Sequence, residues 1–239
     1  MVYSVNPMFG GVRSPEQAKP LFMKGPVLMS ALVNGLKEGR AQIVVAYGTS
    51  LTAGGAWVTQ LQQALDEKYP GLATVLNSGQ GDMNSRWGVE NLESRVIQKN
   101  PDTVFIEFAI NDAFLDFKIS TEEARVNLET MIDRILKWKP SCEVIPMTMN
   151  PPVGIHLERG PRIIDYYQIY RNVAKDRNLL LIDHYPQWEH ILDTDRDLFD
   201  RYVPDGLHPW VEGCRHVITP MILKELGLIA DKGPHAEVQ

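Results

Sequence analysis

The sequence has little cysteine and no excess of positive charge. Cys142 and Cys214 are the two cysteines among 239 residues. They are too few for a disulfide framework and lack the close spacing of a zinc knuckle, so we expect two buried, reduced thiols. Lys and Arg number 24 against 30 Asp and Glu, which gives a formal net charge of -6. This balance argues against nucleic acid or an anionic membrane surface as a partner.

Long apolar runs are also missing. No stretch approaches the roughly 20 apolar residues that span a bilayer. The chain begins Met1-Val2-Tyr3-Ser4, without a basic segment followed by an apolar one. The pattern predicts no membrane span and no signal peptide, and so a cytoplasmic location. A secreted protein with its signal peptide trimmed would look the same.

No repeat, charge block or flexible linker divides the chain. A chain of this length buries enough surface for one self-sufficient core. We therefore predict a single domain, with an irregular N-terminal arm and a helix in residues 1–40, a core in 41–228 and a tail in 229–239.

Hydrophobic periodicity predicts an alternation of strands and helices. Apolar, β-branched runs predict strands at residues 42–47, 73–77, 103–109, 143–149 and 179–183. A 3.6-residue period predicts helices at residues 27–37, 56–69, 89–99, 121–139, 162–178 and 211–226. This order is typical of an α/β protein, a three-layer α/β/α sandwich with a mostly parallel sheet.

Ligands of such sheets collect beyond the carboxyl ends of the strands. Ser50 follows the first predicted strand, where it is either a presented hydroxyl or a helix cap. Gly79 and Gly81 follow the second, in a functional loop or an ordinary turn. Asn111 and Asp112 follow the third, as site residues or as a cap. None of these segments alone shows whether its residues are functional or structural.

Asp205 and His208 lie three residues apart in a loop near the C-terminus. At that spacing a carboxylate can accept a hydrogen bond from imidazole Nδ1–H, which leaves Nε2 free as a base. A single Asp-x-x-His is weak evidence. Combined with a serine and two loops at neighbouring strand exits, it favours a nucleophilic serine site.

With these segments in place, the sequence resembles the SGNH hydrolase family, also called GDSL esterases and lipases, over about residues 42–227. The resemblance implies a flavodoxin-like fold with a five-stranded sheet and no cofactor or metal. It implies Ser50 as nucleophile, Asp205 and His208 as acid and base, and oxyanion donors from Ser50, Gly81 and Asn111. The segments that carry it are Gly48-Thr49-Ser50-Leu51, Asn77-Ser78-Gly79-Gln80-Gly81-Asp82, Ala109-Ile110-Asn111-Asp112 and Asp205-Gly206-Leu207-His208.

Three departures from the family pattern accompany this resemblance. Thr49 stands where the family usually has Asp, so a charged acceptor beside the nucleophile is missing. Ala109 stands where the family usually has Gly. The second segment is one residue short, so Gly79 remains a rival to Gly81 as the oxyanion glycine.

The resemblance implies a serine esterase that works through an acyl-enzyme. We expect it to remove small acyl groups, acetyl above all, from a carbohydrate or similar polar carrier, and we expect Thr49, Asp82, Asn150 and His156 to contact this substrate. An esterase for lipids, lysophospholipids or aryl esters and an acyltransferase are the alternatives within this site. A zinc hydrolase using Asp205, His208 and His184, and a catalytically silent carbohydrate-binding domain, are the alternatives outside it. The sequence does not specify an oligomeric state.

Overall fold

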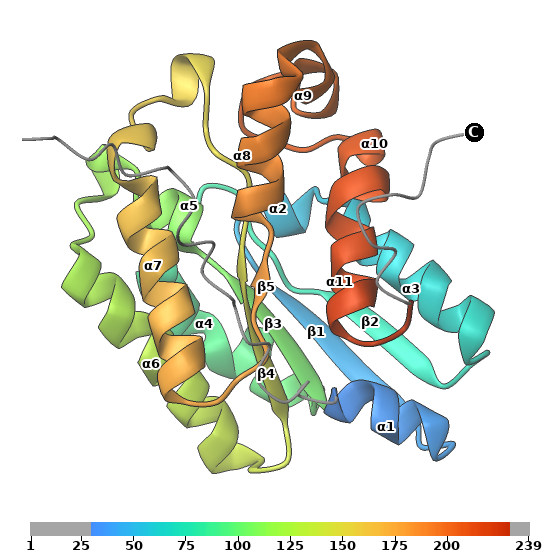
Figure 1. The fold of residues 1–239 in the computed structure, drawn as a ribbon. Helices are drawn as coiled ribbons and strands as arrows, with labels where there is room; N and C mark the ends of the chain where they lie inside the picture. Colours follow the sequence, from blue (N-terminus) through green and yellow to red (C-terminus); the bar gives the residue numbers. More distant parts are fainter. Residues whose placement is uncertain (1–29, 230–239) are drawn as a thin grey trace, which may run out of the picture.

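A computed structural model describes residues 30–229, apart from the side chains of residues 160 and 161 (Figure 1). A five-stranded sheet of order β2-β1-β3-β4-β5 forms its centre, and all the paired strands are parallel. The strands are β1 (Gln42–Gly48), β2 (Ala73–Asn77), β3 (Thr103–Glu107), β4 (Glu143–Thr148) and β5 (Ile182–Asp183). The predicted fold class is confirmed. The proposed arm and nearly all of the tail lie outside the described residues.

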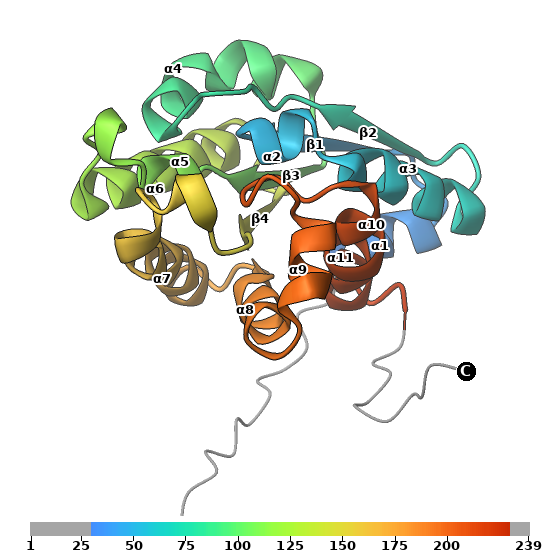
Figure 2. The same ribbon diagram turned by 90° about the horizontal axis from the view of Figure 1, so that it is seen from above.

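Helices connect the strands and cover both faces of the sheet. Helix α4 packs against α6 and α6 against α7, whereas α3 packs on β2 and against α11. Seen from above, α4 lies on one side of the sheet and α8 and α11 lie on the other (Figure 2). The longer helices are α1 (Ala31–Lys37), α3 (Ala56–Lys68), α4 (Ser85–Arg95), α6 (Thr121–Trp138), α7 (Gly160–Asp176), α8 (Tyr185–Thr194), α9 (Arg196–Tyr202) and α11 (Thr219–Glu225).

Short helical segments occupy the connections. They are α2 (Ser50–Ala53), α5 (Ala109–Asp112), α10 (Val211–Gly213), the 3₁₀ turns η1 (Ile97–Lys99), η2 (Leu115–Phe117) and η3 (Gly154–His156), and the π-helical turn η4 (Cys214–Ile218). Segments α2 and α5 begin within two residues of the ends of β1 and β3. Both therefore lie at the carboxyl edge of the sheet, where the polar strand exits were predicted to meet.

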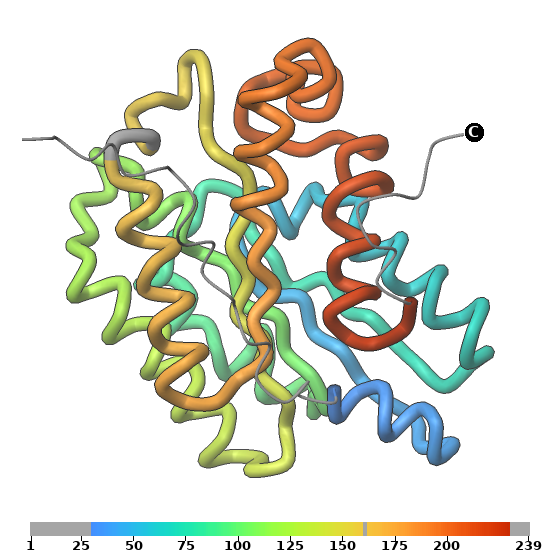
Figure 3. Tube along the Cα trace, viewed as in Figure 1, coloured from blue at the N-terminus to red at the C-terminus, as the bar shows by residue number. Residues whose placement is uncertain are grey.

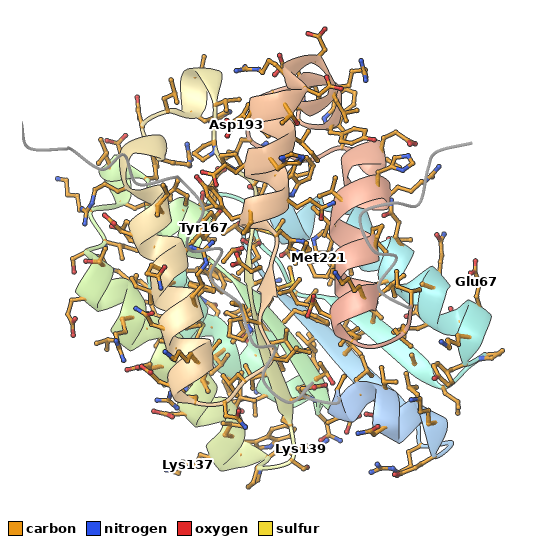
Figure 4. All side chains as sticks on the ribbon, viewed as in Figure 1. Glu67, Lys137, Lys139, Tyr167, Asp193 and Met221 are labelled. Carbon is orange, nitrogen blue, oxygen red and sulfur yellow. The ribbon has the colours of Figure 1, made fainter. Side chains whose placement is uncertain are left out.

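Burial explains why the central strands are so apolar. All residues of β3 and all but one of β1 are buried, because helices cover both of their faces. Tyr167 points from α7 toward the sheet (Figure 4) and is also fully buried. Lys137 and Lys139 lie in the same view at the end of the molecule opposite α2. There Lys139 pairs with Asp102 at 2.6 Å.

Several element boundaries differ from the predictions. Helix α4 begins four residues earlier than expected, because the Asn84 side chain accepts from the N–H groups of Arg86 and Trp87 and so caps the helix there. Strand β5 keeps two of its five predicted residues, since it pairs with β4 only at Ile182 and Asp183. The predicted helix at 211–226 is interrupted by the π-helical turn η4. Helices α8 and α9 were not predicted.

Both cysteines are free and buried, as predicted. Burial raises the pKa of the Cys142 thiol to about 12 and that of Cys214 to about 11, so both stay protonated near neutral pH. Within residues 30–229, no helix combines the length and apolar character that crossing a membrane requires.

Candidate active site

The turn after β1 presents Ser50 at the carboxyl edge of the sheet. Thr49 caps α2, and its hydroxyl oxygen accepts from the N–H of Leu51 at 3.2 Å. Ser50 is the first residue of α2, so its own N–H has no acceptor within that helix. The turn leaves both the hydroxyl and the N–H of Ser50 available to a bound molecule.

A buried carboxylate supports this turn from below. Glu107 is the last residue of β3 and lies opposite Gly48 of β1. Its Oε1 accepts from the Thr49 N–H at 2.8 Å, the Thr49 hydroxyl at 3.0 Å and the Thr52 hydroxyl at 2.7 Å. Burial raises the pKa of Glu107 to about 7, although these hydrogen bonds oppose the shift. The hydrogen-bond acceptor that the sequence lacks at position 49 is therefore supplied by the carboxyl group of a neighbouring strand.

The expectation that Thr49 contacts substrate needs correction. Its side chain is 0% exposed, and its hydroxyl donates to the Glu107 carboxylate. A side chain enclosed in this way holds the turn in shape and does not face the cleft.

Asp205 and His208 form a hydrogen-bonded pair across from Ser50. Asp205 Oδ2 lies 2.6 Å from His208 Nδ1, and Asp205 Oδ1 accepts from the backbone N–H groups of Leu207 and His208. Partial burial acts to raise the pKa of Asp205. The three hydrogen bonds outweigh it, so the pKa lies below its ordinary value. The carboxylate is thus ionised at neutral pH and fixes the orientation of the imidazole.

The loop that carries this pair is tied to the exit of β4. Asn150 Nδ2 donates to the Leu207 carbonyl at 2.9 Å, and the N–H of Val153 donates to the Gly206 carbonyl at 2.8 Å. Asn150 is 0% exposed. The expectation that it contacts substrate is therefore also corrected: its amide holds the loop that presents His208.

These elements bring three predicted residues into line. His208 Nε2 lies 2.9 Å from Ser50 Oγ, although 158 positions separate the two residues. The turn after β1 and the segment before α10 lie at the same end of the molecule (Figure 3). With Nδ1–H donated to Asp205, Nε2 is the nitrogen that can accept the Ser50 proton.

The two candidate oxyanion glycines differ in their surroundings. The Gly79 N–H donates to Asn77 Oδ1 at 3.0 Å, and a Cβ added at Gly79 would lie 2.5 Å from the Ala53 nitrogen. Gly81 has open space around it and lines the cavity beside Ser50 and His208. Gly79 therefore serves close packing against α2, whereas Gly81 faces the cavity.

Asn111 lies on α5, just beyond β3, and is 3% exposed. Its Nδ2 donates to the Met83 carbonyl at 2.8 Å, which ties α5 to the loop that carries Gly81. An amide nitrogen has two hydrogens, so one N–H remains for another acceptor.

A cavity of about 690 Å³ opens beside Ser50 and His208. Its walls are mostly apolar or small, and Trp210 and Val211 form an exposed rim, at 63% and 51% exposure. The lining residues include Leu51, Ala53, Gly55, Ala56, Trp210 and Val211.

The remaining predicted contacts lie on another side of the site. The rings of His156, in η3, and His208 stand edge to face, 6.4 Å apart. Asp82 is exposed, one residue beyond Gly81. His184 does not join Asp205 and His208. It is 0% exposed, burial lowers its pKa to about 3, and within residues 30–229 no three potential metal ligands gather.

A parallel α/β sheet with serine, imidazole and carboxylate in line at its carboxyl edge is the arrangement of a serine hydrolase. The family model of the GDSL-like lipase/acylhydrolase family matches residues 45–216. The chain belongs to this family and is a carboxylic ester hydrolase.

Similar solved structures share the fold. One is a catalytic mutant of Axe2, an acetylxylan esterase from Geobacillus stearothermophilus, with a TM-score of 0.67 and 22% identity over 80% of this chain and 96% of that one. Another is LAE5, an alpha/beta hydrolase enzyme from the metagenome of Lake Arreo, with a TM-score of 0.63 and 21% identity over 80% of this chain and 98% of that one. No curated protein matches the chain.

Proposed function

We propose that this esterase removes small acyl groups, acetyl above all, from a carbohydrate or similar polar carrier through an acyl-enzyme on Ser50. The observation that carries the proposal is the unbroken hydrogen-bonded line from Ser50 Oγ through His208 to Asp205, at 2.9 and 2.6 Å. Such a line activates a hydroxyl that is otherwise a weak nucleophile.

In the proposed mechanism, Ser50 Oγ attacks the ester carbonyl carbon while His208 Nε2 takes its proton. The Asp205 carboxylate stabilises the resulting imidazolium. His208 then gives this proton to the leaving alcohol, and water attacks the acyl-enzyme with His208 again acting as base. The N–H groups of Ser50 and Gly81 and the free amide N–H of Asn111 would stabilise the oxyanion.

Two features support a small acyl group on a polar carrier. The cavity beside Ser50 is walled by residues with little or no side chain, Gly54, Gly55 and Ala53 among them. Trp210 at its rim is 63% exposed and offers a flat surface on which a sugar ring can stack. The structurally similar Axe2 is an acetylxylan esterase.

The apolar cavity wall favours a second candidate, an esterase for longer acyl chains. Leu51 and Val211 would contact such a chain. A panel of acetyl, butyryl and octanoyl esters of one alcohol separates the two, with Ser50→Ala as the control for each ester. We expect kcat/KM to be highest for acetyl and hydrolysis to vanish in the variant. A preference for octanoyl would overturn the small-acyl proposal. Full activity of Ser50→Ala would show that Ser50 is not the nucleophile.

A further inference from the structure

An arginine that forms no ion pair within residues 30–229 lies beside the proposed site. Arg159 precedes α7, and its Nη1 lies 3.4 Å from Nδ1 of His156. His156 in turn packs edge to face against His208. Arg159 is thus separated from the proposed base by a single side chain.

The Arg159 guanidinium is held in place but is not neutralised. It lies 4.1 Å above the ring of Phe114, which is a cation–π contact. Among the described residues, no carboxylate lies within 4.0 Å of it, and its Nε is buried without a hydrogen-bond partner. Burial lowers the pKa of Arg159, while the charges of Glu158 and Asp82 act to raise it. An unpaired, partly buried guanidinium of this kind is a strong site for an anion.

The direction of the reaction places this arginine on the alcohol side of the ester. The leaving alcohol oxygen must come to His208 Nε2 to receive its proton. His156 borders His208, and Arg159 lies beyond His156. An alcohol part that extends from His208 over His156, away from Trp210, would approach the guanidinium.

We propose that Arg159, stacked on Phe114 beside His156, binds a carboxylate on the alcohol part of the ester. The preferred substrates are then acyl esters of acidic alcohols, such as acidic sugar residues or hydroxy acids. This inference rests on the proposed function and narrows its substrate class. A carboxylate matches the planar fork of the guanidinium and can accept two hydrogen bonds from it.

A matched pair of acetyl esters tests the proposal. One is 4-acetoxybenzoate, which carries a carboxylate on its alcohol part, and the other is its neutral methyl ester. The measured quantity is the ratio of kcat/KM for the anionic over the neutral ester, corrected for the rates at which hydroxide hydrolyses each. We expect a ratio of about 10 to 100 in the wild-type protein, from charge-assisted hydrogen bonds. Added salt should lower it.

Three variants test whether Arg159 is the residue that produces this ratio of kcat/KM values. Arg159→Gln should bring it close to one, mainly through KM for the anionic ester. Arg159→Lys should keep part of it, because Lys retains the charge but not the fork. Arg162→Gln is the matched control. It removes the same charge three positions along from an exposed side chain whose guanidinium lies 5.5 Å from the ring of Tyr166. It should leave the ratio unchanged.

Asp82→Asn provides a test in the opposite direction. The negative charge of Asp82 acts on Arg159 and would repel a substrate anion bound there, so its removal should raise the ratio. A wild-type ratio near one, or a ratio that Arg159→Gln leaves unchanged, would overturn the proposal.

Failure of the proposed function gives a different result, namely no hydrolysis of either ester. Binding then tests Arg159 directly, with 4-acetamidobenzoate as a non-hydrolysable amide analogue in calorimetry. Binding that is equal in wild type and Arg159→Gln would contradict the anion site.

Discussion

Two carboxylates, Glu107 and Asp205, support the proposed catalytic groups in opposite environments. Glu107 is 2% exposed and holds the turn of Ser50 from inside the sheet, and its pKa is raised to about 7. Asp205 holds the imidazole of His208 from a side chain that is 45% exposed, and its pKa is lowered. Glu107 holds the shape of the turn within the core, whereas Asp205 supplies a negative charge at the surface. The same chemical group thus takes two roles according to its surroundings.

Among substitutions of these two carboxylates, we expect Asp205→Asn to have the largest effect on kcat. Asparagine fills the same space but cannot stabilise an imidazolium, so kcat should fall by about 10³–10⁴. Steady-state kinetics on an acetyl ester measures this change. Urea unfolding should show a loss of less than about 1 kcal/mol, because asparagine keeps an oxygen that accepts from the two backbone N–H groups. A fall in kcat of less than tenfold would remove Asp205 from the proposed mechanism.

Removal of the buried partner should act on stability as well as rate. Glu107→Ala leaves the Thr49 N–H without its acceptor, at a cost of about 2–4 kcal/mol in the free energy of unfolding. Displacement of the turn should lower kcat by about 10- to 100-fold.

Glu107→Gln is the control for this change, because it keeps the shape and one acceptor oxygen. It should recover most of the stability. Glu107→Ala with wild-type stability and rate would show that the turn holds its shape without the carboxylate.

The two glycines of the loop after β2, Gly79 and Gly81, also lie in contrasting environments, one closely packed and the other open. Gly79→Ala forces a Cβ against the Ala53 backbone and should cost about 2–3 kcal/mol in urea unfolding. Gly81→Ala points into open space and should change stability by less than about 0.5 kcal/mol. Equal losses in the two variants would contradict the different positions of these glycines.

The dependence of stability on pH gives the smallest expected effect. Glu107 titrates near 4.5 in the unfolded chain and near 7 when folded. Between these pH values the folded protein keeps a proton that the unfolded chain has lost, so its stability falls as the pH rises. The raised pKa of Asp112, also about 7, acts in the same direction.

Asp205 changes the dependence of stability on pH in the opposite direction. Its contribution is present above its ordinary pKa and is lost as the pH falls through the lowered folded value. Urea unfolding at pH 5 and pH 8 measures the difference. Glu107→Gln should remove its share of the decline, about 2 kcal/mol. Asp112→Asn, away from the Ser50 turn, should remove the share of Asp112 and leave that of Glu107 in place. A decline as steep in Glu107→Gln as in wild type would argue against a raised pKa at this carboxyl.

The sequence predicted the sheet well because buried parallel strands form apolar runs that are visible locally. The run at 103–109 contains all five residues of β3, each of which is buried. The sequence also located the segments bearing Ser50, Asn111 and His208, since each follows a strand or lies in a loop at the same edge. Helices α8 and α9, which follow the last strand of the sheet, were missed.

The role of Glu107 could not be predicted, because its contact with Thr49 spans 58 positions and depends on the register of β1 against β3. The only local signal was a single acidic residue that ends a buried apolar strand. Thr49 and Asn150 were misassigned for a related reason. A polar residue beside a site can point into the cleft or into the core, and sequence spacing does not distinguish the two directions.

The central claim is that Ser50 is the hydroxyl activated by His208 and Asp205. Labelling with a fluorophosphonate, followed by peptide mapping by mass spectrometry, tests it most directly. We expect one adduct, located on Ser50, that forms far more slowly in His208→Ala and is absent in Ser50→Ala. An adduct on another residue, or equal labelling of Ser50→Ala, would contradict it.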